Sequence, residues 1–405
     1  MSNKILLCVS RTGGGHVSAA EAIQSAVAEL VKSLHFCGTP YEFVVADVVE
    51  ESSGLHRQFV RFYNYLLRHK PEWMQYYYRA IEYFKPDNSW FGYWLASSYL
   101  RKLLRQVDPV LVLSVHPMAN HYLARAMKSA KLAKRPKLMI VVTDPNAELW
   151  KGWASLDAYI TVAPNQLVQK RLVELGVNPD KIAVIGMPVH PIYLKPPLVA
   201  RQQFLKELGL EPERLTICLT AGLAGGSKVV EIYKALTNVR RNIQVLAICG
   251  SNEELFGELQ ALAGEISLPT AIVRRLDSMS DAMAACDLLI TKAGGLTTFE
   301  AVARRLPMAL DMTSDLMPQE SGTARLLIEA GLGQAIYNPY DIVPIVAALK
   351  RVEDRQSTIL PAVHHLDCTH AVYQIARLAL ANCWSEGETR NARSLIMSRG
   401  ARLSV

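Results

Sequence analysis

The stretch from Lys292 to Glu300 has the residue types and spacing of a phosphate-binding turn. It reads Lys-Ala-Gly-Gly-Leu-Thr-Thr-Phe-Glu and follows an apolar run at 287–291, so the pattern predicts a strand, a tight turn and the start of a helix. Gly294 and Gly295 let the backbone bend and approach a ligand closely. The helix that begins there offers free N–H groups and the positive end of its dipole, which together hold an anion.

The side chains of the same stretch extend this prediction from an anion to a nucleotide. Thr297 and Thr298 carry hydroxyls that can bond phosphate oxygens, and Lys292 adds a positive charge. Glu300 can accept two hydrogen bonds from a ribose diol, or it can cap backbone N–H groups of the first helical turns. A phosphate cradle with a ribose-binding carboxylate suits a nucleotide-sugar site. The alternative is an ordinary glycine turn with Glu300 as a solvated acid.

A second glycine turn, Gly13-Gly14-Gly15-His16, lies near the start of the chain. It follows the apolar run 5–10 and precedes a helical pattern with an apolar face formed by Ile23, Val27, Leu30, Val31 and Leu34. Three consecutive glycines keep space for a ligand, and open α/β sheets place ligands at the carboxyl ends of their strands. His16 is therefore a candidate for proton transfer; the alternative is a helix-terminal histidine without chemistry.

Polar residues follow two other predicted strands in the first half of the chain. The strand 110–116 ends with His116, and the strand 138–144 ends in Thr143-Asp144. Because the carboxyl ends of parallel strands lie at one edge of a sheet, we expect both side chains on the same side as the His16 turn.

The predicted elements that position these residues alternate between strands and helices throughout. Further strands are expected at 41–49, 159–163, 182–185, 216–220, 244–249, 270–273, 288–291 and 308–311. The fold class is therefore α/β, with two doubly wound parallel-sheet (Rossmann-like) domains and a cleft between them. The length of the chain, 405 residues, is also more than a single hydrophobic core usually contains, which favours two domains.

The predicted boundaries follow the same alternation. We expect an N-terminal domain at 1–192, a proline-stiffened hinge at 193–213 and a C-terminal domain at 214–368. Residues 369–405 are expected to form a C-terminal helix and a basic tail.

The segment 55–105 interrupts the α/β alternation with a helical insertion. It holds about half of the chain's aromatic residues, with nine Lys and Arg against three Asp and Glu, whereas the whole chain has a net charge of +7. Aromatic and basic side chains on short helices suit the headgroup boundary of an anionic membrane. The alternatives are an insertion whose aromatics form a core, and a surface for single-stranded nucleic acid, which no RNA-binding motif supports.

Composition excludes several other classes. Half of the residues are hydrophobic and a fifth are charged, as in a globular protein and not a disordered one. Seven scattered cysteines form no metal motif and suit a reducing cytoplasm, and the start of the chain leads into a strand without a signal peptide. No apolar run reaches the roughly 18 residues of a membrane span.

The ordered set of motifs resembles the diacylglycerol glycosyltransferases, which include monogalactosyldiacylglycerol synthase and the processive diacylglycerol glucosyltransferases. More distantly it is similar to the N-acetylglucosaminyltransferase that makes lipid II. The segments that carry the resemblance span most of the chain: 13–23, 114–117, 141–144, 186–189, 248–252, 285–300 and 319–322.

The resemblance implies a GT-B fold, with a lipid acceptor on the N-terminal domain and a UDP-sugar on the C-terminal one. His16 would be the catalytic base, with Asp144 in the cleft near the acceptor. The residues implied on the acceptor side are Gly14, Gly15 and His116. Those implied for the donor are Gly222, Gly226, Ser227, Gly250, Asn252, Lys292, Gly294, Gly295, Thr297, Glu300, Gln319 and Glu320.

Four positions depart from the family pattern: His190, Arg274, Arg275 and Thr323, and the loop 222–228 has fewer glycines than the family's usual phosphate loop. These departures bear on the identity of the donor more than on the fold. The chain also lacks the Asp-x-Asp pair of metal-dependent sugar transferases, so we expect no metal and no cofactor, since the UDP-sugar is a substrate.

The function expected from sequence is an inverting transfer of galactose or glucose from a UDP-hexose to 1,2-diacylglycerol. The enzyme would work as a peripheral protein at the cytoplasmic face of an anionic membrane, without nucleic acid as a partner. The alternatives are a transferase of the same fold with a polyprenyl-linked or soluble acceptor, a weakly catalytic UDP-sugar sensor, and a nucleotide-sugar epimerase of related fold. Sequence decides neither galactose against glucose nor single against processive transfer.

Overall fold

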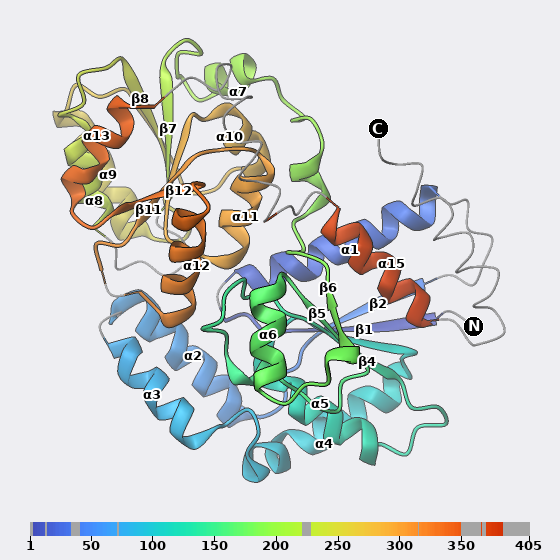
Figure 1. Cartoon of the computed structure of the whole chain (residues 1–405). Coiled ribbons are helices and arrows are strands. Elements are labelled where there is room, and N and C mark those ends of the chain that lie inside the picture. The colour runs from blue at the N-terminus through green and yellow to red at the C-terminus, as the bar shows by residue number, and fades with distance from the viewer. Residues whose placement is uncertain are drawn as a thin grey trace.

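Two six-stranded parallel sheets organise the chain, each covered by helices (Figure 1). The computed structural model describes residues 3–12, 14–33, 41–70, 73–220, 228–314, 316–349, 366 and 370–383. The predicted arrangement of two doubly wound parallel-sheet domains is confirmed.

The first sheet has the strand order β2-β1-β3-β4-β5-β6. Its central strands are largely apolar because both faces of a parallel sheet are covered; Ile5, Leu6 and Leu7 in β1 have no exposed surface. The strands are β1 (Asn3–Val9), β2 (Tyr41–Asp47), β3 (Leu111–Ser114), β4 (Lys137–Val141), β5 (Ile160–Ala163) and β6 (Ile182–Val184).

The second sheet has the order β12-β11-β10-β7-β8-β9. Its strands are β7 (Leu215–Thr220), β8 (Ile243–Ile248), β9 (Thr270–Val273), β10 (Leu288–Thr291), β11 (Met308–Asp311) and β12 (Gly333–Ile336). Sequence reasoning missed β12. This edge strand has four residues and begins with glycine, so it lacks the β-branched apolar run that identifies the others.

Helices connect and cover the strands. The α-helices are α1 (Gly15–Ser33), α2 (Gly54–His69), α3 (Met74–Phe84), α4 (Trp90–Val107), α5 (Asn120–Ser129), α6 (Gln166–Glu174), α7 (Arg201–Glu207), α8 (Val229–Leu236), α9 (Glu253–Glu265), α10 (Met279–Ala285), α11 (Gly295–Ala303), α12 (Pro318–Glu329), α13 (Ile342–Ala347) and α15 (Ala371–Cys383). Short 3-10 helices are η2 (Pro117–Ala119), η3 (Lys151–Trp153), η4 (Pro179–Lys181), η5 (Pro191–Leu194) and η6 (Pro339–Asp341).

The chain returns to the first domain at its C-terminal helix. Helix α15 packs along α1 (Figure 1), and the Tyr373 hydroxyl donates to Glu29 of α1 at 2.8 Å. Lys195, just after η5, also donates to Glu29, at 2.7 Å. Glu29 thus links α1 both to α15 and to the segment after η5, where the chain crosses from the first domain to the second. The predicted basic tail lies outside the described residues.

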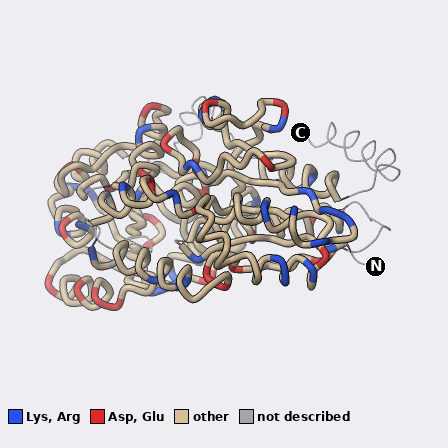
Figure 2. The backbone as a smooth tube through the Cα atoms, turned by 90° about the horizontal axis from the view of Figure 1, so that it is seen from below, with Lys and Arg blue, Asp and Glu red and all other residues tan. Residues whose placement is uncertain are grey.

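The predicted insertion forms α2, α3 and α4 between β2 and β3. It exposes eleven of the twenty large hydrophobic side chains that are exposed in the described chain: Leu55, Phe59, Phe62, Tyr65, Trp73, Tyr76, Tyr83, Phe84, Trp90, Phe91 and Trp94. Figure 2 shows basic positions gathered at the end of the molecule nearer the N-terminus, with acidic positions more frequent at the other end. Among the described residues, no helix has the length and apolar character needed to span a membrane.

Candidate functional site

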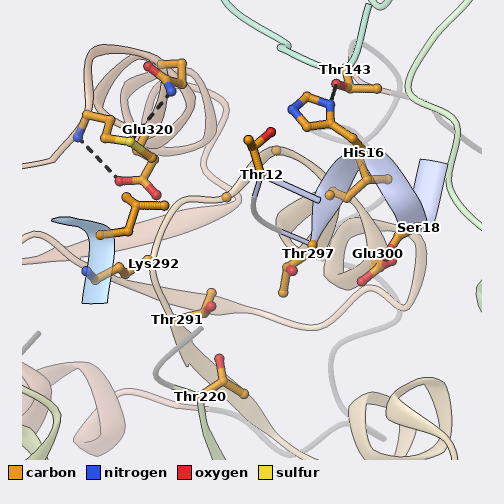
Figure 3. Close-up of a pocket in the computed structure, with 18 of the residues that line it drawn as sticks. Thr12, His16, Ser18, Thr143, Thr220, Thr291, Lys292, Thr297, Glu300 and Glu320 are labelled. Atoms are coloured by element: carbon orange, nitrogen blue, oxygen red, sulfur yellow. Dashed lines mark hydrogen bonds between the residues drawn. The ribbon is translucent and has the colours of Figure 1, made fainter. Parts of the chain in front are cut away.

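A cavity of about 510 Å³ lies between the two domains. It opens where the strand order of each sheet reverses, between β1 and β3 on one side and between β7 and β10 on the other, as expected for ligands of open α/β sheets. Figure 3 shows residues of the first domain, Thr12, His16 and Thr143, on one wall, and Thr220, Thr291 and Lys292 of the second domain on the opposite wall.

His16 is the second residue of α1 and lines the cavity. Its Nδ1 lies 2.8 Å from the backbone oxygen of Val115, which can only accept, so Nδ1 carries the proton and Nε2 keeps its lone pair. The Thr143 hydroxyl lies 3.2 Å from the same nitrogen (Figure 3). Burial lowers the pKa of His16, partly offset by the carboxylate of Asp144. The ring is therefore neutral at pH 7 and suited to accept a proton at Nε2.

His116 lies behind His16, with the ring centres 4.4 Å apart, and does not line the cavity. Its Nδ1 accepts from the N–H of Met118 at 3.3 Å, so its Nε2 carries the proton and donates to the Thr12 hydroxyl at 2.6 Å. Burial lowers the pKa of His116 well below its ordinary value, and the neighbouring His16 adds to this. Both nitrogens are occupied, so His116 supports the His16 turn and is not itself a base.

Asp144 follows β4 and lines the cavity near His16. Its Oδ2 accepts from the indole N–H of Trp153 at 2.6 Å, and the backbone N–H of Trp150 bonds the same carboxyl. Burial raises the pKa of Asp144, although His16 and these donors pull it down. As a carboxylate it stabilises a positive charge on His16.

The N-terminus of α11 forms the opposite wall, with Gly294 as its N-cap and Gly295 as its first residue. A Cβ at Gly295 would lie 2.8 Å from the backbone oxygen of Thr143, so glycine is needed here because the two domains approach closely. Thr297 and Lys292 line the same wall, and Lys292 is only 9% exposed. Free N–H groups, a hydroxyl and an ammonium group thus face the cavity together.

Glu300 is buried within α11 at the edge of the cavity. Burial raises its pKa to about 7, although a hydrogen bond from Tyr193 of η5 opposes the shift. Tyr193 belongs to the segment that crosses between the domains. The carboxyl group of Glu300, which the family resemblance assigns to a ribose, is therefore bonded by a residue of the segment that connects the two domains.

The start of α12 closes the remaining side of the cavity with Gln319 and Glu320. Glu320 accepts from the backbone N–H of Met317 at 3.4 Å, and burial raises its pKa against the lowering effect of Lys292. A Cβ at Gly322 would lie 2.4 Å from Oδ1 of Asn146, a second close approach of the domains.

The structure brings most of the sequence-predicted residues to one cavity. Those that line it are Gly14, Gly15, His16, Asp144, Gly250, Lys292, Gly294, Gly295, Thr297, Glu300, Gln319 and Glu320. Asn252 does not line it; its side chain caps α9 by accepting from the N–H of Leu255 at 3.0 Å. Gly222, Gly226 and Ser227 lie outside the described residues.

Sequence reasoning missed Trp153, Tyr193 and Asn146, which hold the site together. Asn146 donates to the backbone oxygen of Gln319 at 2.8 Å and to the Thr323 hydroxyl at 2.9 Å. Its position two residues after Asp144 was the available signal. The departure at Thr323 has a structural reason, since its hydroxyl takes part in this contact between the domains.

Two other departures turn away from the cavity. Arg274 forms a two-pronged ion pair with Glu253 and covers the ring of Phe256, with the guanidinium carbon 3.8 Å from the ring centre. His190 caps η5 by accepting from the N–H of Ile192 at 3.1 Å. Within the described ranges, no group of three or more His, Cys, Asp or Glu side chains is arranged to hold a metal ion.

Comparison with known proteins identifies the parts of the chain. The family described as "Monogalactosyldiacylglycerol (MGDG) synthase" matches residues 16–189, and the "Glycosyltransferase family 28 C-terminal domain" matches residues 217–311. The crystal structure of MurG from Acinetobacter baumannii is 14% identical with a TM-score of 0.57, covering 94% of this chain and 99% of that one. A putative UDP-N-acetylglucosamine 2-epimerase from Listeria monocytogenes is 13% identical with a TM-score of 0.59, covering 96% and 97%. The expected GT-B fold is confirmed.

Curated relatives share more sequence. The probable chloroplastic monogalactosyldiacylglycerol synthase of Nicotiana tabacum is 32% identical over 85% of this chain, which spans 64% of that relative's length. Monogalactosyldiacylglycerol synthase 2 of Arabidopsis thaliana is 30% identical over 85% of this chain and 73% of its own length. The chain therefore belongs to the monogalactosyldiacylglycerol synthase family.

Proposed function

We propose that the protein is an inverting glycosyltransferase that moves galactose or glucose from a UDP-hexose to 1,2-diacylglycerol at a membrane surface. The observation that carries the proposal is His16, with a free lone pair at Nε2, facing the N-terminus of α11 across one cavity. The names of its relatives, which are monogalactosyldiacylglycerol synthases, support the same reaction.

The donor binds against the C-terminal domain. The diphosphate lies at the N-terminus of α11, where the backbone N–H groups, Thr297 and Lys292 bond its oxygens. The ribose diol donates to the carboxylate of Glu300, and the hexose lies toward Gln319 and Glu320. These groups stabilise the negative charge that builds on the diphosphate as it leaves.

The acceptor reacts on the side of His16. The hydroxyl of diacylglycerol gives its proton to Nε2 while its oxygen bonds the anomeric carbon from the face opposite the diphosphate. The bond from that carbon to the diphosphate breaks, and UDP leaves with the electron pair, so the configuration inverts. The carbonyl of Val115 and the carboxylate of Asp144 stabilise the imidazolium that forms.

Helix α2 joins the cavity to the proposed lipid surface. Tyr63, Asn64 and Leu67 of α2 line the cavity, whereas Phe59 and Phe62 on the same helix are about half exposed. An acyl chain entering between the exposed rings would bring its glycerol hydroxyl toward His16. A soluble acceptor gives no reason for so many exposed aromatic residues.

Basic residues on α2 and α3 favour an anionic surface. Arg57, Arg61, Arg79 and Lys85 are exposed among the aromatic side chains. We therefore propose a peripheral enzyme at the cytoplasmic face of an anionic membrane. Transfer needs neither metal nor cofactor in this proposal, because α11 and Lys292 supply the positive field at the leaving group.

The test is transfer from radiolabelled UDP-galactose and UDP-glucose to diacylglycerol in mixed anionic liposomes that contain EDTA. A glycolipid product from one or both donors is the expected result, and it also tests metal independence. If UDP binds but no acceptor in the liposome yields a product, the proposed reaction is wrong and a UDP-sugar sensor becomes the better description.

A further inference from the structure

The start of α12 packs against helices α2 and α3, which form the helical insertion of the N-terminal domain. Helices α2 and α3 lie directly beneath α12 (Figure 1), and Met317 packs with Tyr63, Tyr77 and Tyr78 against the buried residues of these helices. Gln319, two residues later, lines the cavity. The insertion therefore contacts the wall where the proposed donor hexose lies.

The chemistry of the contacting atoms determines which of them donate and which accept hydrogen bonds. Sδ of Met317 has no proton, so it can only accept. It lies 3.5 Å from the Tyr78 hydroxyl and 3.7 Å from the Tyr63 hydroxyl, which donate to it. Because the Tyr78 proton is directed at sulfur, its oxygen presents lone pairs to the next neighbour.

That neighbour is the side-chain amide of Gln319. Its Nε2 donates to the Tyr78 oxygen at 2.5 Å. The same nitrogen lies 3.8 Å from Sδ of Met317, which can only accept, so the amide nitrogen faces Tyr78 and Met317, and the amide oxygen Oε1 is left on the other side. The contact thus fixes which end of the amide is available, a choice that an unrestrained glutamine leaves open.

The backbone of Gln319 is fixed as well. Its carbonyl accepts from Asn146 and from Thr323, each at 2.8 Å. Burial raises the pKa of Tyr78 further above its ordinary value, so the phenol stays protonated and the chain of bonds persists at physiological pH. Gln319 is consequently held at both its main chain and its side chain.

We propose that Tyr78 is a positioning residue for donor selection, because it holds the Gln319 amide with Oε1 free to accept a hydrogen bond from a hydroxyl of the donor hexose. This inference rests on the proposed function. Epimeric hexoses differ in the direction of one hydroxyl, so an acceptor with one fixed orientation separates them better than an amide that can turn over. In this proposal, the specificity of the C-terminal domain for its sugar donor depends on Tyr78, a residue of the N-terminal domain.

The test compares Tyr78→Phe with Tyr77→Phe in the full chain. Tyr77 lies beside Tyr78 on α3, and in the described part of the chain its hydroxyl forms no hydrogen bond, so the control makes the same chemical change without touching Gln319. Calorimetry with UDP-galactose, UDP-glucose and UDP measures affinity without turnover, and liposome assays give kcat and KM for both donors. Thermal melting checks that both variants fold.

We expect Tyr78→Phe to weaken binding of the preferred UDP-hexose and to raise its KM about threefold to tenfold, the loss of one hydrogen bond. The ratio of the two affinities should move toward one, whereas UDP, which lacks the hexose, should bind as before. Tyr77→Phe should match the wild type. In a Gln319→Ala background, Tyr78→Phe should have no further effect on hexose preference.

An unchanged ratio of the two affinities in Tyr78→Phe overturns the inference, and so does an equal loss for UDP, which indicates a general disturbance of the site. The proposed function fails separately. In that case the wild type makes no glycolipid, although its preference between UDP-hexoses still responds to Tyr78→Phe.

Discussion

The backbone oxygen of Val115 accepts a hydrogen bond from Nδ1 of His16 at 2.8 Å. A carbonyl oxygen can only accept, so the contact fixes the tautomer in which Nε2 is free to take a proton. Val115 follows β3, and His16 lies in the first turn of α1, which follows β1. The adjacent position of β1 and β3 in the sheet therefore brings the two residues together. The sheet topology thus sets the chemistry of the proposed base.

The lowered pKa of His16 predicts where activity falls in acid. Burial disfavours the imidazolium, so the ring stays a base below its ordinary pKa of 6.5 and loses this role only as the pH falls further. We expect the acidic limb of the profile of kcat against pH, measured at saturating UDP-hexose so that donor binding by Glu300 does not contribute, to have its midpoint below 6.5. A midpoint above 7 would contradict this environment for the base.

Glu300 predicts a pH dependence of UDP binding. A carboxylate accepts hydrogen bonds from both hydroxyls of a ribose diol, whereas a neutral carboxylic acid accepts more weakly and uses one oxygen to carry its proton; the pKa of Glu300 is about 7. Affinity for UDP should therefore rise as the pH rises from 6 to 8, by up to about tenfold for full ionisation of one required group.

Calorimetry at several pH values measures this dependence. The Glu300→Gln variant retains the titration of UDP itself but should lose the contribution of the carboxyl. Equal pH dependence in the variant and the wild type would show that Glu300 does not bind the ribose, and 2′-deoxy-UDP offers a second control with a reduced effect.

The close approach of the domains predicts the effect of adding one methyl group. In Gly295→Ala the Cβ would lie 2.8 Å from the backbone oxygen of Thr143, which cannot turn away as a flexible side chain can. The cleft must widen, so we expect kcat/KM to fall about tenfold or more, as misplacement of reacting groups by about 1 Å does elsewhere.

Gly257→Ala on α9 is the matched control, because no described atom lies within 4 Å of its added Cβ. Kinetics and thermal melting of both variants give the answer. If Gly295→Ala is as active as Gly257→Ala, the closed arrangement is not the active one.

The exposed aromatic residues of the insertion predict membrane binding. Replacing Trp90 and Trp94, which are 75% and 59% exposed, by serine should reduce flotation with anionic liposomes without lowering the melting temperature. Tyr340→Ser, at an exposed aromatic residue of the second domain, is the control and should float as the wild type does. Equal flotation of the tryptophan variant, or wild-type binding that ignores lipid charge, would reject the proposed surface.

Local patterns predicted most of the fold. Eleven of the twelve strands in the described residues have the apolar runs from which they were predicted. Both glycine turns lie at the cavity because each follows a strand beside a reversal of strand order. The missed strand β12 lies at an edge, where little burial is required and the pattern is therefore weak.

The site was less predictable because its supporting contacts join distant parts of the chain. Asn146 and Tyr78 both form hydrogen bonds with Gln319, although each is more than 170 positions away from it in the sequence. No spacing in the sequence predicts either pair. His116 was correctly placed at a strand end, but its position behind His16 follows from the packing of two rings. Asn252 caps α9. An asparagine after a glycine turn can either cap a helix or bind a ligand, and the sequence alone does not distinguish these two roles.

The most direct test of the central claim is the rate of hexose transfer to diacylglycerol by His16→Ala, with UDP affinity measured in parallel. If His16 is the base, kcat should fall about a hundredfold or more while UDP binds as tightly as before, since general base catalysis contributes at least that factor. Turnover near the wild-type rate with unchanged UDP affinity would show that the acceptor proton goes elsewhere, and the account of this site would be wrong.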